Sequence, residues 1–311
     1  MRKVILGFLF SINFLVAEGQ TMEVVYSNPK DTLFNYYIAF KPQGEVKGLL
    51  VLLTSFGESP QITSNETDIH KIANKNGLIT VFASLQYGTY TFFIDSLSQS
   101  SIDQLLKNLH ERYGIINKPI FLGGFSLGGS GVIKYAERAN ANAGLLKPKA
   151  IFAIDPPLDF ERLYYSLEYA VRNSTVPIAK NEADYFIKRI QYEFQSYPEY
   201  DKTPFQTISP YSFSDTNQTN IKFLANTPVM LISEPDIIWQ MEERDRSLYE
   251  LNVLDCSLAI NSLRLMGNNN AKLVLTANKG YRKLSGKKNP HSWSIADSEE
   301  TINWLLSFAK N

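Results

Sequence analysis

Short, continuous apolar runs that alternate with helical patterns constrain the fold of this chain most strongly. Gly48–Thr54, Leu78–Ser84 and Ala150–Ile154 are almost entirely apolar, which is typical of strands buried on both faces of a sheet. Ser101–Tyr113 instead carries apolar residues at helical spacing. Strands that alternate with helices form parallel units. The order therefore predicts an α/β fold with a mostly parallel central sheet and helices on both faces.

The other expected elements continue this alternation. Two edge strands are expected near the N-terminus, at Glu23–Ser27 and Tyr36–Phe40, with turn-forming residues between them. The remaining expected strands are Pro119–Gly123, Pro228–Ile232 and Ala271–Thr276. The remaining expected helices are Thr67–Lys75, Ser130–Ala139 and Ile295–Phe308.

One interval, 160–222, breaks the alternation. It separates two expected strands that a short crossover would normally join, it is rich in Tyr and Phe, and its pattern is mostly helical. An insertion of this length above a sheet is usually structured and often functional. We therefore predict a helical cap within one domain that spans 20–311, with most of the aromatic side chains packing the cap on its base.

The first residues have the layout of a secretory signal peptide. Arg2 and Lys3 are followed by the mostly apolar run Val4–Val16 and then by Ala17-Glu18-Gly19. The alternatives are a membrane anchor or a buried N-terminal helix, but the run is shorter than the ~20 residues of a membrane span. We expect 1–19 to be removed after Gly19, and the protein to be exported to the periplasm or the medium without stable membrane insertion.

Composition excludes several classes of protein. Lys plus Arg and Asp plus Glu number 31 each, so the net charge is zero and no nucleic-acid partner is expected. The single Cys256 cannot form an internal disulfide, and we interpret it as a small buried apolar residue. The sequence contains no H-E-x-x-H pattern, no cysteine pair and no Walker A motif. Neither a metal ion nor another cofactor is therefore expected.

The pentapeptide Gly124-Phe125-Ser126-Leu127-Gly128 has the pattern G-x-S-x-G. It follows an apolar strand and opens a helical segment, which is the setting that a nucleophile elbow requires. A tight turn of this kind holds the serine in a strained conformation and exposes its hydroxyl at the carboxyl end of the sheet. The flanking glycines are needed because a Cβ would clash with the neighbouring strand and helix. The N-terminus of the following helix directs free N–H groups at a developing oxyanion.

With this motif in this position, the chain resembles the α/β-hydrolase family. The resemblance covers the element order of nearly all of 20–311 and is most specific at the motif. It implies a triad in the chain order Ser, acid, His, with Ser126 as the nucleophile. His291 lies after the last expected strand and before the closing helix, where the resemblance places the general base. His70 and His110 precede the motif in expected helices, and we interpret them as helix-surface or boundary residues.

Three carboxylates are candidates for the acid of the triad. The family usually carries a glycine and then an aspartate just after the strand expected at Pro228–Ile232. Asp236 fits that spacing best and Glu234 comes second, although the glycine is missing. Some α/β-hydrolases place the acid after an earlier strand, and Asp155 at the end of Ala150–Ile154 is the third candidate.

The oxyanion hole that the resemblance implies needs two backbone N–H groups. One is expected from Leu127, the residue after the serine. The other is expected from the loop after Gly48–Thr54, where Phe56 is the first choice and Gly57 the alternative. Family members often carry His-Gly before this donor, whereas Thr54-Ser55 stand here.

These features together predict an exported serine hydrolase that cleaves an ester bond through an acyl-enzyme, and an amide bond only in second place. The expected partner is a small-molecule or polymer-linked acyl substrate. The alternative hypothesis is a non-catalytic binding protein that keeps the hydrolase fold, because the oxyanion loop departs from the family pattern. Labelling by a serine-directed probe discriminates between the two.

Overall fold

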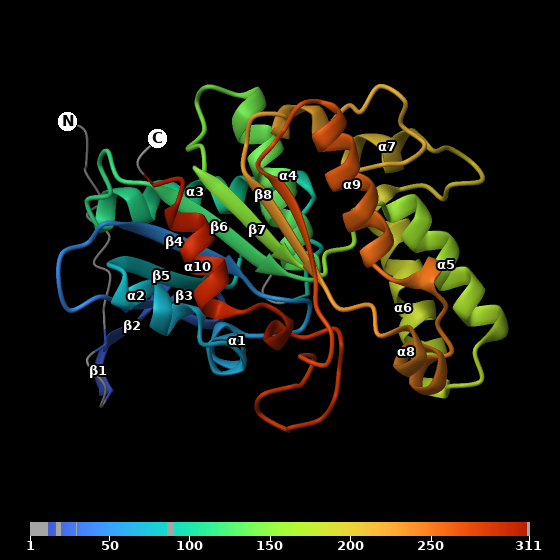
Figure 1. The fold of residues 1–311 in the computed structure, drawn as a ribbon, viewed down its shortest axis with the longest axis horizontal. Helices are drawn as coiled ribbons and strands as arrows, with labels where there is room; N and C mark the ends of the chain where they lie inside the picture. The colour runs from blue at the N-terminus through green and yellow to red at the C-terminus, as the bar shows by residue number, and fades with distance from the viewer. Residues whose placement is uncertain (1–11, 17–19, 29, 86–89, 310–311) are drawn as a thin grey trace.

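The computed structural model describes residues 12–16, 20–28, 30–85 and 90–309. Its strands are β1 (Ile12–Val16), β2 (Gln20–Asn28), β3 (Asp31–Lys41), β4 (Gly48–Leu53), β5 (Leu78–Ala83), β6 (Ile120–Phe125), β7 (Ala150–Ile154), β8 (Val229–Ser233) and β9 (Ala271–Leu275). Within the described residues they form one 9-stranded sheet in the order β1-β2-β3-β5-β4-β6-β7-β8-β9 (Figure 1). The pairs among β4 to β9 are parallel, and the pairs that join β1, β2, β3 and β5 are antiparallel. The predicted mostly parallel sheet is confirmed.

Helices cover both faces of this sheet. The α-helices are α1 (Pro60–Glu66), α2 (Ile69–Lys75), α3 (Ser96–Arg112), α4 (Leu127–Ala141), α5 (Phe160–Asn173), α6 (Pro177–Phe194), α7 (Thr203–Ile208), α8 (Ile237–Arg244), α9 (Val253–Leu265) and α10 (Ser298–Leu306). Short 3-10 helices are η1 (Ile221–Leu224), η2 (Leu248–Glu250) and η3 (Trp293–Ile295). Helices α2 and α10 pack on one face, and α3, α4 and α9 on the other. None of the helices in the described part of the chain is long and apolar enough to cross a membrane.

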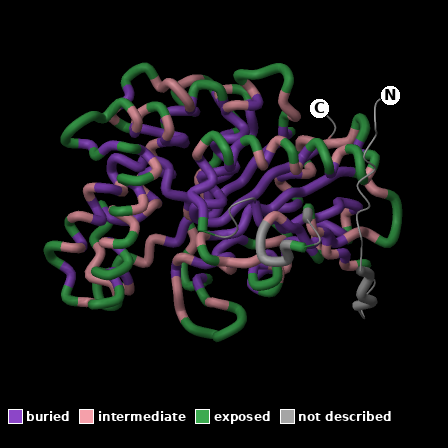
Figure 2. The backbone as a smooth tube through the Cα atoms, turned by 180° about the vertical axis from the view of Figure 1, so that it is seen from behind, coloured by how far each residue is buried: buried purple, intermediate pink, exposed green. Residues whose placement is uncertain are grey.

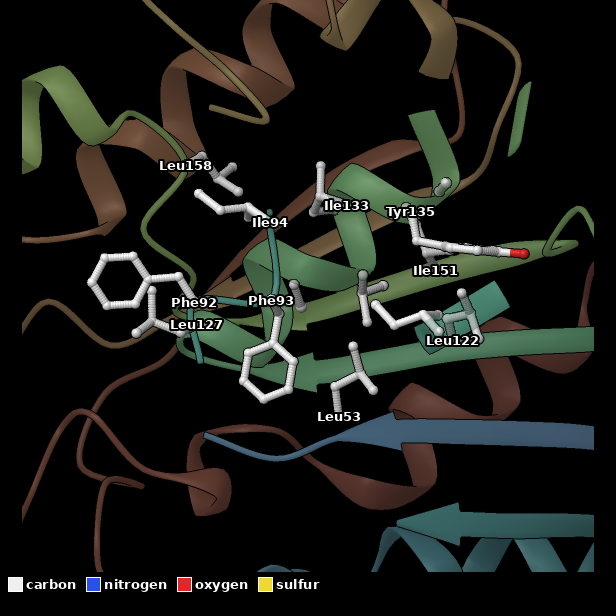
Figure 3. Packing of buried hydrophobic residues seen from close by; sticks show 14 of the residues in the cluster. Leu53, Phe92, Phe93, Ile94, Leu122, Leu127, Ile133, Tyr135, Ile151 and Leu158 are labelled. Carbon is white, nitrogen blue, oxygen red and sulfur yellow. The ribbon is translucent and has the colours of Figure 1, made fainter. Parts of the chain in front are cut away.

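Strand β4 shows why the central strands are continuous apolar runs. All its residues are buried, and alternate side chains enter different cores. Leu49, Val51 and Leu53 join the cluster under α3 and α4, whereas Leu50 and Leu52 join the cluster under α2 and α10. Burying one such side chain contributes roughly 1.5–3 kcal/mol. Figure 2 shows the resulting buried centre of the molecule, and Figure 3 shows part of the first cluster.

The interval 160–222 contains α5, α6, α7 and the start of η1. With α8, the helices α5, α6 and α7 form a group to one side of the sheet (Figure 1), whereas α9 contacts β8 and β9. Aromatic contacts join α5, α6 and α7, because Phe194 lies 4.7 Å from Phe205 and 5.4 Å from Phe160 between ring centroids. The sequence pattern did not predict α8 or α9. Helix α9 buries one side, but this side includes Asp255 and Ser262, whereas Leu265 is exposed, so the sequence lacks the clear apolar stripe by which a surface helix is recognised.

The N-terminal strands β1, β2 and β3 bear on two expectations from the sequence. The prediction of two edge strands is wrong for both, because β2 lies between β1 and β3, and β3 lies between β2 and β5. The apolar residues of β3, such as Ile38 and Ala39, are accordingly buried. Residues 12–16, within the expected signal peptide, pair with β2 as strand β1. Residues 1–11 and 17–19 lie outside the described residues, so the expected cleavage after Gly19 stays a prediction.

Candidate active site

Ser126 occupies a sharp turn between β6 and α4. Its backbone angles are φ 53° and ψ −126°, a conformation that costs a non-glycine residue roughly 1–3 kcal/mol. Two hydrogen bonds hold it there: its N–H donates to the carbonyl of Ile154 at 2.8 Å, and its carbonyl accepts from the N–H of Ser130 at 3.1 Å. The strained turn that the motif predicts is therefore present.

The glycines that flank Ser126 are required by the close approach of neighbouring backbone. A Cβ on Gly128 would lie 2.2 Å from the carbonyl oxygen of Thr54 on the β4 side. A Cβ on Gly124 would lie 2.5 Å from the backbone of Gly128. Both distances are far shorter than a van der Waals contact. Strand β4, the turn and the start of α4 can approach this closely only where a side chain is missing.

His291 joins the serine to a carboxylate. Its Nε2 lies 2.9 Å from Ser126 Oγ, and its Nδ1 lies 2.6 Å from Asp155 Oδ2. A carboxylate accepts, so Nδ1 donates to Asp155, and the neutral ring then leaves Nε2 free to accept from the serine hydroxyl. The ring of Phe125 lies 4.6 Å from that of His291 and limits its orientation. The order serine, histidine, carboxylate is the arrangement that activates a serine nucleophile.

Asp155 is held by backbone contacts at the carboxyl end of β7. Its φ is 45°, an unusual value for a residue other than glycine. Its N–H donates to the carbonyl of Ile232 at 2.7 Å, and its carbonyl accepts from the side-chain amide of Asn252 at 3.0 Å. Its side chain is 14% exposed. The position of this carboxylate is therefore set by the sheet and by the start of α9.

A buried ion pair fixes the loop that follows Asp155. Asp255 on α9 is fully buried, accepts from the N–H groups of Leu158 and Asp159 at 3.0 and 3.1 Å, and pairs with Arg162. Burial and the nearby charge of Asp255 raise the pKa of Asp159 to about 6. Cys256 is buried beside this loop, as predicted. Removing one partner of such a buried pair is strongly destabilising.

The structure does not bring the first two candidate acids to His291. Asp236 lies past the end of β8, caps α8 by accepting from the N–H of Trp239 at 3.3 Å, and pairs with Lys288 at 2.6 Å. The preference for Asp236 is therefore corrected in favour of Asp155. The physical reason is that α8 begins at once after Asp236, so its side chain completes the helix N-terminus.

Glu234 is directed to the loop after β9. It is 3% exposed and accepts from the N–H groups of Lys279 and Gly280 at 2.9 and 3.0 Å and from the hydroxyl of Thr276 at 3.1 Å. These bonds occupy both of its carboxylate oxygens. Glu234 thus orders the segment that leads to His291 and takes no part in the contact with its ring.

The two expected oxyanion donors lie around the same pocket as Ser126. Leu127 is the first residue of α4, and Phe56 follows β4; both line the pocket together with Ser126 and His291. Gly57, the alternative donor, has φ 77° and takes the tight turn of this loop. The ring of Phe56 packs 5.2 Å from that of Phe186 on α6. The side chain of Leu127 belongs to the core cluster that also contains Phe92 and Leu158 (Figure 3).

The pocket has a volume of about 330 Å³. One side carries Ser126, His291 and Asp155, and we call the opposite side the cap wall. The cap wall comprises Leu163, Ser166, Leu167 and Ala170 of α5, Glu182 and Phe186 of α6, Trp239, Gln240 and Arg244 of α8, and Arg246 just after α8. The sequence pattern missed the α8 part of this wall. The sequence signal that could have predicted α8 is an aspartate that can cap a helix, followed by apolar residues and by an arginine at the helix end.

The other two histidines lie outside the site. His70 is 5% exposed, with its ring 4.4 Å from that of Phe40, and burial lowers its pKa to about 4. The expectation of a helix-surface position is thus wrong for His70, which is a core residue. His110 lies in the last turn of α3. Among the described residues, no group of three His, Cys, Asp or Glu side chains could hold a metal ion.

Comparison with solved structures identifies the fold. No protein-family model and no curated protein sequence matches the chain. An S-formylglutathione hydrolase from Agrobacterium tumefaciens aligns with a TM-score of 0.59 and 13% identity, over 96% of this chain and 99% of that one. Carboxyl esterase 2 from Tuber melanosporum gives 0.56 and 11%, over 97% and 84%. Acetyl xylan esterase 1 from Thermoanaerobacterium sp. gives 0.52 and 12%, over 97% and 87%. The chain has the α/β-hydrolase fold.

Proposed function

We propose that this chain is a serine hydrolase that cleaves carboxylic esters through an acyl-enzyme. The observation that carries the proposal is the hydrogen-bonded chain from Ser126 through His291 to Asp155, with distances of 2.9 and 2.6 Å. These three side chains line a pocket of about 330 Å³, a volume within the range of small-molecule sites.

The first half of the proposed reaction forms the acyl-enzyme. His291 Nε2 accepts the proton of the Ser126 hydroxyl as Oγ attacks the ester carbonyl. Asp155 keeps the ring in the required tautomer and stabilises the imidazolium that forms. The imidazolium then donates its proton to the departing alkoxide, and the alcohol leaves.

The second half releases the acid. A water molecule gives its proton to His291 Nε2 and attacks the acyl carbonyl, and Ser126 Oγ leaves with a proton returned by the ring. The N–H groups of Leu127 and Phe56 are the proposed donors to the oxyanion in both halves. Each such donor is worth about 2.7–4 kcal/mol in the transition state.

The preference for esters rests on two supports. The solved structures that share the fold include proteins named as a carboxyl esterase and an acetyl xylan esterase. The cap wall bounds one side of the pocket, where the ring of Phe186 lies 5.2 Å from that of Phe56. A pocket of this size suits a small acyl or alcohol group better than an extended polypeptide.

A fluorophosphonate probe and 4-nitrophenyl butyrate test the proposal together. We expect the purified protein to be labelled and to hydrolyse the ester, and both activities to be lost in Ser126→Ala and His291→Ala. Ser166→Ala is the matched control, because Ser166 lines the same pocket but its hydroxyl bonds the carbonyl of Leu163. A folded wild-type protein that neither reacts with the probe nor turns over esters would reject the proposal and favour a binding protein.

A further inference from the structure

Two arginines of the cap wall are accessible from the pocket. Arg244 ends α8 and Arg246 follows it, and both line the pocket that contains Ser126 and His291. Their side chains are 28% and 25% exposed. The guanidinium of Arg244 lies 5.9 Å from the ring centroid of Trp239, which also lines the pocket. Both cations are therefore partly buried, yet a ligand can reach them.

One glutamate faces both arginines. Glu182 on α6 lies 3.9 Å from a nitrogen of Arg244 and 3.5 Å from a nitrogen of Arg246, and its side chain is 44% exposed. These distances exceed the 2.7–3.2 Å of ordinary N–H···O hydrogen bonds. Among the described residues, Glu182 is the one carboxylate within ion-pair distance of either guanidinium, and neither guanidinium donates a hydrogen bond to another residue. The N–H groups of both arginines can therefore still bind a closer anion.

The other charged groups of the lining are already engaged. Asp155 bonds His291. Glu234 accepts three hydrogen bonds from the loop after β9. Glu250 accepts from the N–H and hydroxyl of Ser247 through Oε2, whereas its buried Oε1 has no hydrogen-bond partner among the described residues. Arg282 pairs with Glu58 at 2.7 Å. Arg244 and Arg246 are thus the two cations of the lining that have no partner closer than Glu182 among the described residues.

The segment that carries the arginine pair is held in place. Asp245, between them, accepts from the N–H and hydroxyl of Thr175 at 2.6 and 2.9 Å and from the N–H of Val176 at 3.2 Å, in the loop between α5 and α6. The N–H of Arg246 donates to the carbonyl of Gln240 at 3.0 Å. Fixing the backbone in this way lowers the entropy that the two arginines lose when a ligand binds.

A buried amide next to the pair also indicates a polar ligand. Gln240 is 7% exposed and lines the pocket, and its Oε1 has no hydrogen-bond partner among the described residues. Buried polar atoms normally have partners. Because Oε1 is an acceptor, a hydrogen-bond donor elsewhere on the ligand would satisfy it, whereas a hydrocarbon chain or a carboxylate would not.

We infer that the substrate of this site is a small ester that also carries a carboxylate, and that Arg244 and Arg246 bind this carboxylate. Planar guanidinium groups match carboxylate oxygens in geometry as well as in charge. The ester part of this inference rests on the proposed function; the anion site rests only on the arginine pair.

Matched pairs of esters test the inference and show where the carboxylate sits. Mono-4-nitrophenyl adipate is compared with its neutral methyl ester for an anion on the acyl side. 4-Acetoxybenzoate is compared with 4-acetoxybenzamide for an anion on the alcohol side. In one pair we expect kcat/KM to be about tenfold higher for the anionic ester, which corresponds to about 1.4 kcal/mol. Salt at ~0.5 M should reduce this ratio because it screens partly exposed charges.

Substitutions that remove positive charge and a substitution that removes negative charge should change the ratio in opposite directions, which makes the test specific. Arg244→Gln and Arg246→Gln should lower the ratio of anionic to neutral kcat/KM towards one, chiefly through KM. Glu182→Gln should raise the ratio, because it removes the competing carboxylate, and this result does not depend on the stability of the arginine variants. Arg172→Gln is the matched control: it replaces an arginine of α5 that is 65% exposed and lies outside the pocket lining, and the ratio should not change.

Calorimetry with monomethyl adipate separates the two proposals. Binding that is lost in Arg244→Gln and Arg246→Gln supports the anion site even if no ester is hydrolysed, in which case only the proposed function fails. Hydrolysis of both members of each pair at equal rates, together with no binding of monomethyl adipate, would overturn the anion site and leave the hydrolase intact.

Discussion

Replacing Asp155 by asparagine tests which carboxylate orients His291. Asparagine keeps the size of the side chain but removes its charge. Its amide can donate to Nδ1 of His291, which would place the ring proton on Nε2 and leave no acceptor for the Ser126 hydroxyl. The matched variant is Asp236→Asn, because Asp236 is the carboxylate that the sequence spacing favours.

The expected magnitude follows from the geometry of the contact. The 2.6 Å distance between Asp155 Oδ2 and His291 Nδ1 is that of a short hydrogen bond, and the carboxylate is only 14% exposed. Two unit charges at this separation interact by about 6.4 kcal/mol at an effective dielectric constant of ~20. Loss of this interaction with the imidazolium, together with the wrong tautomer, should lower kcat by about 10³–10⁴-fold.

Asp236→Asn should change kcat by less than about threefold, because the variant loses only a surface ion pair worth ~0–1 kcal/mol. Asparagine also keeps the cap of α8, since it is as good a capping residue as aspartate. The assay is steady-state hydrolysis of 4-nitrophenyl butyrate, with fluorophosphonate labelling rates as a second readout. An inactive Asp236→Asn protein beside an active Asp155→Asn protein would refute the assignment of Asp155.

Three further predictions concern stability and processing. Gly128→Ala should lower the free energy of unfolding in urea by about 1–3 kcal/mol, because the added Cβ would lie 2.2 Å from a backbone oxygen. Gly44→Ala is the control and should change this free energy little, because no atom lies within 4 Å of the added Cβ. For Asp159, the native pKa of about 6 lies above the ordinary value of 3.8, so the native state binds the extra proton and its contribution to stability is lost as the pH rises through about 6. Between pH 4 and 7 the unfolding free energy of the wild type should therefore fall by about 2 kcal/mol relative to Asp159→Asn; parallel pH profiles would contradict this. Mass spectrometry of the protein exported from its native host should find Gln20 at the N-terminus, and an intact Met1 would reject cleavage after Gly19.

The sheet could be predicted because its central strands need apolar residues on both faces. Alternate residues of β4 enter different cores, so the sequence reads as one continuous apolar run. The nucleophile elbow was equally readable, because backbone approach within 2.5 Å of a Cβ position permits only glycine at positions 124 and 128. Burial of a strand on both faces and close approach of the backbone are both local requirements, and each restricts the residue types in one short segment of the sequence.

Sequence spacing could not identify the acid that contacts His291, because the neighbouring strands β7 and β8 both end close to this histidine and a carboxylate follows each of them. Strands β7 and β8 are parallel neighbours, with Ile154 opposite Ile232, so a residue after either strand can approach His291. The choice depends on the backbone beyond the strands. Asp155 is held by the N–H bond to Ile232 and stays outside a helix, whereas Asp236 begins one. Neither the positive φ of Asp155 nor the bond from Asn252 leaves a pattern in the sequence.

The position of the acid also explains where the arginine pair comes from. Asp155 after β7 supplies the carboxylate that contacts His291, so no residue after β8 is needed for this contact. Glu234 instead accepts hydrogen bonds from the loop after β9. Asp236 can then cap α8, which carries Trp239 and Arg244 into the cap wall. An acid at position 236 would have to face His291 and could not cap this helix. The placement of the proposed triad acid and that of the proposed anion site are therefore two consequences of one arrangement at the ends of β7 and β8.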